Sequence, residues 1–260
     1  MPELVAVIPA GGKGTRLAAV TGARPKSLAP VLEEPFVHLQ LRHLCSLGFD
    51  RVHLCLGYGA EQILATVTEG TPEGLTVTHT IEPEPLGVIG AVRLALPELP
   101  PRFLMTYGDV LIPPAVDALL ERHATNPCEA TVLVTTASDE SNIELGDGEM
   151  VTFYGKGNTH NSFVDIGLCA LNSSCIAALP SDRPITELTL FTTLISRRGL
   201  AALPWPQKSL HIGDPEHLRE VESWAAAMEV SGRANWPVQS RRSGIAESTT
   251  RSHAARTWRE

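Results

Sequence analysis

The stretch "IPAGGKGTRLAAVTGARPKSLAPV", residues 8–31, decides how the rest of the chain is interpreted. It begins inside a short apolar run, "LVAVIPA" (residues 4–10), which is rich in Val and ends at glycine. Such a run is typical of a buried parallel strand. Gly11, Gly12 and Gly14 then allow backbone N–H groups to turn inward, where they can bind phosphate oxygens. The stretch therefore predicts a strand followed by a phosphate-binding loop.

Two cations in the same stretch strengthen this prediction. Arg16 carries a planar, permanently charged guanidinium that matches phosphate geometry. Lys26 follows Pro25, whose ring stiffens the returning chain, and it offers a compact ammonium to the same pocket. We expect both side chains to face a polyanion.

Two common phosphate-binding motifs do not fit this loop. A P-loop requires G-x-x-x-x-G-K-[ST], which the stretch lacks. A dinucleotide fingerprint requires G-x-G-x-x-G, and Leu17 stands where its third glycine or alanine should be. The missing third glycine argues against a hydride-transfer enzyme. The pattern that the loop does show is G-G-x-G-T-R-L, followed about nine residues later by P-K.

Strand-like and helix-like segments alternate through the rest of the chain. We expect further strands at 51–58, 75–82, 102–112, 129–137 and 162–171, and a hairpin at 146–156. We expect helices at 35–49, 60–70, 86–99, 114–125, 185–199 and 215–230. This order predicts a single α/β domain over residues 1–230, with a Rossmann-like, doubly wound, mostly parallel mixed sheet. Residues 231–260 lack periodicity, and we expect a mobile tail rich in Arg and Ser.

Composition narrows the class of protein. The 260 residues are 43% hydrophobic and 19% charged, and the formal net charge is −8. An acidic protein is poorly suited to bind nucleic acid, but it can take anionic substrates through a local basic pocket. The sequence has no apolar run long enough for a membrane span and no basic leader, so we expect a cytoplasmic protein. Five scattered cysteines without metal spacing predict reduced thiols.

The opening stretch resembles the signature of the sugar-1-phosphate nucleotidyltransferases, also called nucleotide-sugar pyrophosphorylases. The family pattern is close to L-A-G-G-x-G-T-R-L-x-x-x-T-x-x-x-P-K-x-L-x-P-V, from which this chain departs mainly at Pro9. The segments "EPLGVIGAV" and "YGDVLI" resemble later parts of the same pattern. The resemblance is good over residues 4–125 and patchy to 225, and its wording is closest to the D-glycero-D-manno-heptose 1-phosphate guanylyltransferase branch. It implies the nucleotidyltransferase type of fold.

The resemblance also implies an activity. In that family a sugar 1-phosphate attacks the α-phosphorus of a nucleoside triphosphate (NTP) and pyrophosphate leaves. A nucleotide-binding role is implied for Ala10, Gly11, Gly12, Gly14, Thr15, Glu84, Leu86 and Gly87. Catalytic roles are implied for Arg16, which would bind the leaving phosphates, for Lys26 at the α-phosphate, and for Asp109 as a ligand of Mg²⁺. Lys156 and Asp165 match positions at the sugar-phosphate end.

The chain departs from the family pattern at the second metal ligand. Where relatives often show D-I-G-x-P-E, this sequence reads "HIGDPE", so His211 replaces the aspartate and Asp214 follows three residues later. His211, Asp214 or Asp165 could complete a working Mg²⁺ site. Alternatively, the protein is a catalytically silent regulatory subunit that binds nucleotide sugars. A glycosyltransferase ranks third, because "YGDV" has one aspartate and not a D-x-D pair.

The sequence thus predicts an enzyme that makes a nucleotide sugar from an NTP and a sugar 1-phosphate with Mg²⁺. Neither nucleic acid nor a membrane is an expected partner. The base, the sugar and the formation of a homo-oligomer stay open at this point.

Overall fold

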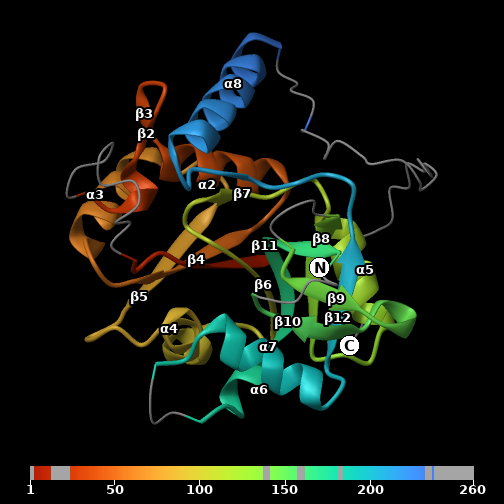
Figure 1. Ribbon diagram of the computed structural model, residues 1–260. Helices are drawn as coiled ribbons and strands as arrows, with labels where there is room; N and C mark the ends of the chain where they lie inside the picture. Colours follow the sequence, from red (N-terminus) through yellow and green to blue (C-terminus); the bar gives the residue numbers. More distant parts are fainter. Residues whose placement is uncertain are drawn as a thin grey trace.

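The computed structural model describes residues 3–12, 24–136, 141–156, 162–180, 184–231 and 236. A nine-stranded sheet lies at the centre of this part of the chain, with helices on both faces (Figure 1). Its strands are β1 (Val5–Pro9), β4 (Arg51–Leu56), β5 (Thr76–Ile81), β6 (Arg102–Thr106), β8 (Ala130–Thr136), β9 (Ile143–Leu145), β10 (Val151–Tyr154), β11 (Phe163–Asn172) and β12 (Leu200–Pro204). The α/β fold predicted from the sequence is confirmed.

The order of strands across the main sheet is β12-β8-β11-β6-β1-β4-β5. Strands β12, β8, β6, β1, β4 and β5 run in one direction, whereas β11 runs antiparallel between β6 and β8. The β9–β10 hairpin joins the sheet where Phe163 of β11 pairs with Ile143. The sheet is therefore mixed but mostly parallel, as predicted.

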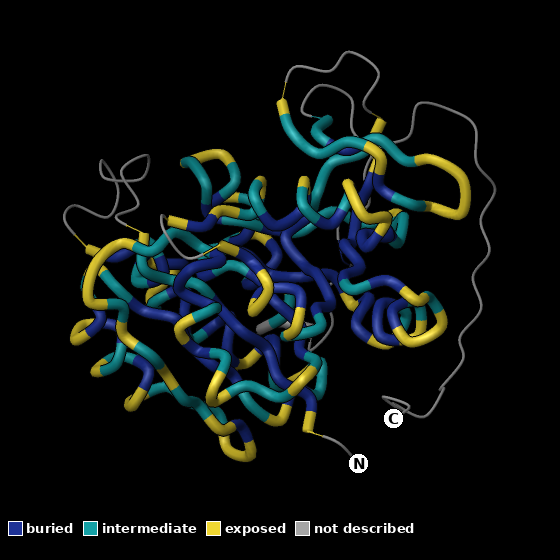
Figure 2. The backbone as a smooth tube through the Cα atoms, turned by 90° about the horizontal axis from the view of Figure 1, so that it is seen from below, coloured by how far each residue is buried: buried dark blue, intermediate teal, exposed yellow. Residues whose placement is uncertain are grey.

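Helices of the two faces bury separate apolar clusters against the sheet. The helices are α2 (Phe36–Ser46), α3 (Ala60–Gly70), α4 (Val88–Ala95), α5 (Val116–Thr125), α6 (Ser173–Ala177), α7 (Glu187–Ser196) and α8 (Pro215–Ser231). Side chains of α2, α3 and α5 pack with one face of the sheet, and those of α4, α6 and α7 pack with the other. Buried strands run through the middle of the molecule, and exposed segments gather at its rim (Figure 2).

The alternation of faces along β1 explains why its sequence is apolar throughout. Ala6 and Ile8 belong to the cluster under α2, α3 and α5, whereas Val5 and Val7 belong to the cluster under α4, α6 and α7. A strand that is buried on both faces has no polar positions, which is typical of a central parallel strand. The edge strand β5 has only exposed and half-buried residues, without the strict alternation that its sequence predicts, because Ile81 is exposed at its end.

A third apolar cluster joins α8 to α2 and to two short pairs of strands. These pairs are β2 (Pro30–Val31) with β3 (Glu34–Pro35), and β7 (Val110–Leu111) with β13 (Leu210–His211). Short 3₁₀ turns occur at Lys26–Leu28, Leu96–Glu98 and Asp147–Glu149. The cluster includes Trp236, so part of the segment predicted as a tail is described and buried. Within the described part of the chain, no helix combines the length and the apolar character needed to cross a lipid bilayer.

Candidate active site

The candidate site lies where four parallel strands end. Pro9 of β1 pairs with Cys55 of β4, and Leu56 of β4 pairs with Ile81 of β5, so the carboxyl ends of these strands lie level with one another. Strand β6 lies on the other side of β1 and runs in the same direction. Ligands of open α/β sheets bind beyond such carboxyl ends. We therefore expect a ligand to bind at this edge of the sheet, among the segments that follow these strands.

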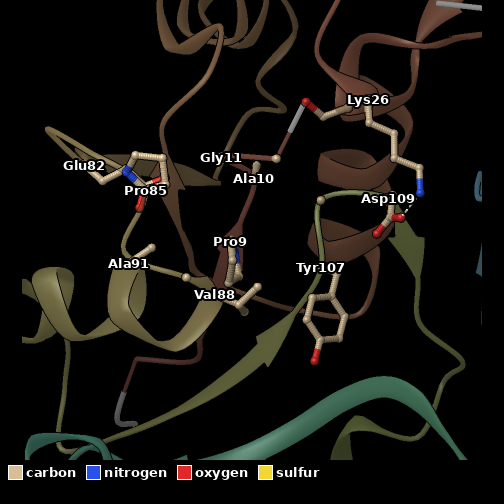
Figure 3. A pocket seen from close by; sticks show the side chains of 14 residues that line it. Pro9, Ala10, Gly11, Lys26, Glu82, Pro85, Val88, Ala91, Tyr107 and Asp109 are labelled. Carbon is tan, nitrogen blue, oxygen red and sulfur yellow. Dashed lines mark hydrogen bonds and ion pairs between the residues drawn. The ribbon is translucent and has the colours of Figure 1, made fainter. Parts of the chain in front are cut away.

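A cavity of about 330 Å³ opens at this edge (Figure 3). One wall is Pro9–Gly12, directly after β1, and a second is the segment between β5 and α4, which contributes Glu82, Pro85, Gly87 and Val88. Lys26, Ser27 and the turn Tyr107–Asp109 form the third wall. In the close-up view, Glu82 and Pro85 lie across the cavity from Lys26 and Asp109. The opening loop and the predicted Gly-Asp turn therefore meet in one cavity.

Lys26 and Asp109 form an ion pair at the cavity wall (Figure 3). The Lys26 ammonium donates a hydrogen bond to Oδ2 of Asp109, and both side chains are partly exposed to solvent. A 3₁₀ turn holds Lys26, because Leu28 N–H donates to Pro25 O (2.9 Å) and Ala29 N–H to Lys26 O (3.0 Å). Two residues predicted to act together are thus brought together.

The turn that carries Asp109 packs tightly against the opening loop. Gly108 N–H donates to Pro9 O at 3.3 Å, and a Cβ at Gly108 would lie only 2.9 Å from Cβ of Ala10. A side chain at position 108 would therefore push the two segments apart. Glycine at this position permits the close approach that sets Asp109 beside residues 10–12.

His211 lies next to Asp109, as the pairing of β13 with β7 requires. His211 pairs with Val110, and Ile212 N–H donates to Asp109 O at 3.1 Å. Gly213 N–H donates to Nδ1 of His211 (3.1 Å), so the proton of the neutral ring is on Nε2. Burial lowers the pKa of His211, and the neighbouring His217 lowers it further. His211 therefore presents a neutral N–H donor at this edge.

Asp214 caps the N-terminus of α8. Its carboxylate accepts hydrogen bonds from Glu216 N (2.9 Å), His217 N (3.0 Å) and His217 Nδ1 (2.6 Å). The hydrogen bond from the His217 backbone is the main reason why the pKa of Asp214 falls to about 2. This is the geometry of a helix N-cap, which uses both carboxylate oxygens.

The segment between β5 and α4 presents Glu82 to the cavity. Oε2 of Glu82 accepts a hydrogen bond from Leu86 N (2.9 Å), and Leu86 O accepts one from Ile185 N (2.8 Å). Gly87 has φ +78°, and a Cβ there would lie 2.5 Å from the Ile185 carbonyl oxygen. Glu84 is exposed and does not line the cavity. The carboxylate that this segment contributes to the cavity is therefore Glu82, two residues before the glutamate that the sequence suggested.

The two residues expected at the sugar-phosphate end lie outside the cavity lining. Lys156 is exposed just after β10, and Asp165 is half-buried on β11. Asp165 Oδ1 accepts a hydrogen bond from Gly167 N (2.8 Å), and the hydroxyl of Tyr154 lies 3.5 Å from Oδ2. Burial raises the pKa of Asp165 to about 6. Both carboxylate oxygens of Asp165 thus already have a neighbouring hydrogen-bonding group within the protein.

Gly14, Thr15 and Arg16 lie outside the described residues, whereas Ala10, Gly11 and Gly12 line the cavity. Among the residues that the structure does describe, no group of three or more His, Cys, Asp and Glu is arranged to hold a metal ion. In the described part of the cavity wall, Asp109 is the carboxylate beside Lys26. This donor set fits Mg²⁺ only together with substrate, because Mg²⁺ is usually bound through one or two carboxylates plus phosphate oxygens and water.

Comparisons with known proteins identify the family and the relatives that the chain resembles. Residues 5–209 match the family described as nucleotidyl transferase. The chain is 28% identical over 221 residues to mannose-1-phosphate guanylyltransferase 1 of Arabidopsis thaliana, covering 81% of this chain and 61% of the relative. It is 28% identical over 173 residues to D-glycero-alpha-D-manno-heptose 1-phosphate guanylyltransferase of Aneurinibacillus thermoaerophilus, covering 65% of this chain and 75% of the relative. The chain thus spans about three fifths of the length of the plant relative.

Solved structures share the fold. HddC from Yersinia pseudotuberculosis, in a crystal structure complexed with GMP-PN, superposes with a TM-score of 0.72 at 24% identity, covering 85% of this chain and 98% of that one. UTP-bound UGPase from Acinetobacter baumannii superposes with a TM-score of 0.71 at 16% identity, covering 88% and 94%. At these identities the likeness establishes the architecture.

Proposed function

The chain belongs to the nucleotidyl transferase family, and from that premise we propose that it joins an NTP to a sugar 1-phosphate. An oxygen of the sugar phosphate forms a bond to the α-phosphorus of the NTP. The bond from that phosphorus to the bridging oxygen of the β-phosphate breaks, and pyrophosphate leaves. The products are a nucleoside diphosphate sugar and pyrophosphate. The activities for which the guanylyltransferase relatives are named support this reaction class.

The Lys26–Asp109 pair at the cavity wall is the observation that carries the proposal. Charge gathers on the phosphoryl oxygens during the transfer, so fixed cations and oriented N–H groups at that point lower the barrier. We assign Lys26 to the α-phosphate. Gly11 and Gly12 lie beside it in the cavity and provide backbone where a triphosphate can approach closely.

The remaining residues of the opening loop complete the phosphate site in this proposal. Ala10, Gly14 and Thr15 contribute backbone and hydroxyl groups to the triphosphate. Arg16 binds the leaving β- and γ-phosphates through its guanidinium. These assignments rest on the family pattern of the loop.

We propose that Mg²⁺ is held by Asp109 together with phosphate oxygens of the nucleotide. When bound, the ion would neutralise phosphate charge and help to align the triphosphate. His211 could ligate such an ion only after giving up the hydrogen bond from Gly213 to its Nδ1, or by losing the proton from Nε2. Asp214 would have to leave the N-terminus of α8. We therefore assign His211 as a hydrogen-bond donor to a phosphate oxygen, with Asp109 as the protein ligand.

Glu82 favours guanine as the base. An ionised carboxylate only accepts hydrogen bonds. Guanine carries two adjacent donors, N1–H and the N2 amino group, on the edge that proteins use to recognise an unpaired base. Glu82 lines the cavity, and its hydrogen bond from Leu86 N fixes the carboxylate. Gly87 lines the same wall, Leu86 would contribute through its N–H bond to Glu82, and the exposed Glu84 would act beside the cavity.

For the acceptor, we keep Lys156 and Asp165 as residues that bind the sugar phosphate. Lys156 would supply a cation for the phosphate and Asp165 an acceptor for a sugar hydroxyl. Both lie on the β9–β11 side of the sheet, which the antiparallel strand β11 connects to β6. We place the reaction in the cytoplasm, where NTPs are abundant.

A pyrophosphate-release assay tests the reaction. GTP, ATP, UTP, CTP and dTTP are each combined with mannose, glucose and heptose 1-phosphates, in the presence of Mg²⁺ or Mn²⁺. We expect turnover that requires both substrates and is fastest with GTP. Absence of pyrophosphate release from every pair would contradict the proposal.

A catalytically silent nucleotide-sugar sensor is the second candidate function, and the histidine beside Asp109 favours it. The same panel separates the two. Binding of a nucleotide sugar, measured by calorimetry, without turnover of any substrate pair would identify the sensor.

A further inference from the structure

Gln40 is a buried polar residue in the middle of α2 whose side chain reaches the turn that carries Asp109. Only 1% of its surface is exposed. Its Nε2 donates one hydrogen bond to Tyr107 O and a second to Val110 O, both at 2.7 Å. These two carbonyl groups stand immediately before and after the Gly108–Asp109 pair. One amide group therefore bridges the turn from end to end.

The arrangement leaves Gln40 little freedom. Both partners are carbonyl oxygens, which only accept, so the NH₂ end of the amide must face the turn and both of its protons are used. Within the described residues, Oε1 of Gln40 is buried and has no hydrogen-bond partner. An unpaired buried acceptor costs free energy. A side chain of this shape without the amide would avoid that cost, but it would lose both bonds to the turn.

Further hydrogen bonds fix the same turn. Val110 N–H donates to Tyr107 O (3.2 Å), which closes the turn, and Ile212 N–H donates to Asp109 O (3.1 Å). Gln40 connects this turn to helix α2, which packs on the central sheet. These hydrogen bonds fix the backbone on both sides of Asp109 and therefore the position of its Cα. From that position the carboxylate contacts Lys26.

We propose that Gln40 is a positioning residue: by bridging Tyr107 and Val110 it holds the Asp109 carboxylate where the metal–nucleotide complex needs it. This inference rests on the proposed function of Asp109. It assigns to Gln40 no contact with substrate. A displacement of about 1 Å at a catalytic group can reduce turnover about a hundredfold, so a residue that acts only through backbone hydrogen bonds can still control the rate.

The test compares Gln40→Met with His43→Met. Methionine at position 40 keeps the length of the side chain and removes both donors. His43 lies one turn later on α2, is also buried, and its Nε2 contacts Ile112 O at 2.7 Å, beyond the Asp109 turn. The two variants therefore lose hydrogen bonds from the same helix to neighbouring segments, and only one of them affects the bridge.

For Gln40→Met we expect kcat to fall about tenfold or more, within the range that misplacement of a catalytic group produces, while KM for the NTP stays within about threefold. We also expect weaker Mn²⁺ binding in the presence of a non-hydrolysable nucleotide, measured by electron paramagnetic resonance of free Mn²⁺. His43→Met should lower the melting temperature and leave kcat and Mn²⁺ binding near wild type. Asp109→Asn gives the reference for full loss of the carboxylate.

Wild-type kcat and Mn²⁺ binding in Gln40→Met would overturn the proposal, as would equal losses in His43→Met. If Gln40→Met does not fold, Gln40→Asn replaces it, since its shorter amide can reach at most one of the two carbonyls; wild-type behaviour there also contradicts the inference. If the wild-type protein shows no turnover, the proposed function fails, whereas the Mn²⁺ titration still decides whether Gln40 positions Asp109.

Discussion

Lys26 donates a hydrogen bond to Asp109 across 83 positions of sequence, and this contact joins the opening loop to the turn after β6. The two residues are the cation and the carboxylate that the proposed reaction needs at one phosphate group. Opposite charges attract most strongly where water is partly excluded. The fold therefore brings both groups together at the cavity wall.

Replacing either member of this pair should remove most of the activity. For Lys26→Met and Asp109→Asn we expect kcat to fall by about a hundredfold or more, the scale on which a single preorganised electrostatic group acts. The fold should survive, because the partly exposed pair contributes little to stability. Steady-state pyrophosphate release and circular dichroism are the measurements.

The matched control is Lys208→Met. Lys208 also forms an ion pair, with Glu220 of α8, but it does not line the cavity. Its loss should leave turnover within about twofold of wild type, as expected for a surface pair. Near-normal rates in Lys26→Met or Asp109→Asn would mean that the site is misplaced.

His211→Asp should strengthen binding of divalent metal to the nucleotide complex. A carboxylate is a better Mg²⁺ ligand than a neutral imidazole, and position 211 lies next to Asp109. We expect the Kd of Mn²⁺ to decrease about tenfold, measured as loss of the free-ion resonance signal. His211→Ala should leave that Kd nearly unchanged; a large increase would instead show that the imidazole ligates the metal.

Glu82→Gln should alter the choice of base. The amide replaces one acceptor by a donor, which opposes the two donors of guanine. We expect kcat/KM for GTP to fall at least about tenfold, the scale on which unpaired polar groups discriminate substrates, with a smaller change for UTP. Glu84→Gln, two residues later and exposed, is the control and should retain the GTP preference. Equal losses for GTP and UTP would contradict base recognition by Glu82.

Asp165 should make stability depend on pH in the acidic range. Its pKa is about 6 in the folded protein, above the ordinary value of 3.8. Between these values the folded state holds more protons than the unfolded chain, so the free energy of unfolding falls as pH rises from about 4 to about 6. Above this range the full cost of the buried charge is present, at most about 3 kcal/mol for a shift of this size.

Urea unfolding of Asp165→Asn at pH 4.5 and pH 7.5 measures this effect. The variant should gain stability relative to wild type at pH 7.5 and lose that advantage at pH 4.5. Asp147→Asn, at an exposed turn, should show no such difference. A wild-type minus variant difference that is independent of pH would exclude a raised pKa at Asp165.

The regular elements of this fold could be predicted because each has a local cause. The apolar run of β1 is buried on both faces, and helix α3 occupies Ala60–Gly70, the range that its pattern predicts. Strand β12, "LAALP", was missed. Its two alanines have low strand propensity, and it becomes a strand because residues 200–204 pair with β8, far away in sequence.

The site was predictable only in part, because some of its residues are defined by contacts with segments far away in the sequence. Lys26 and Asp109 were recognised from a pattern, and the structure brings them together. Glu82 was missed, although it is the last residue of a predicted strand that ends at this edge. Gln40 gave no signal at all, since a glutamine on a helix is ordinary until its two carbonyl partners are known.

Trp236, which lies beyond α8 in the sequence, packs against the third apolar cluster. Its ring stacks on His43 of α2 and meets Trp224 edge-on, and its Nε1–H donates to Lys208 O at 2.6 Å, just before β13. The strand β13 is the one that seats His211 beside Asp109. Loss of Trp236 would thus remove a packing contact shared by α2, α8 and the segment before β13, and we expect it to lower the thermal stability of this edge of the sheet although position 236 lies beyond the last helix.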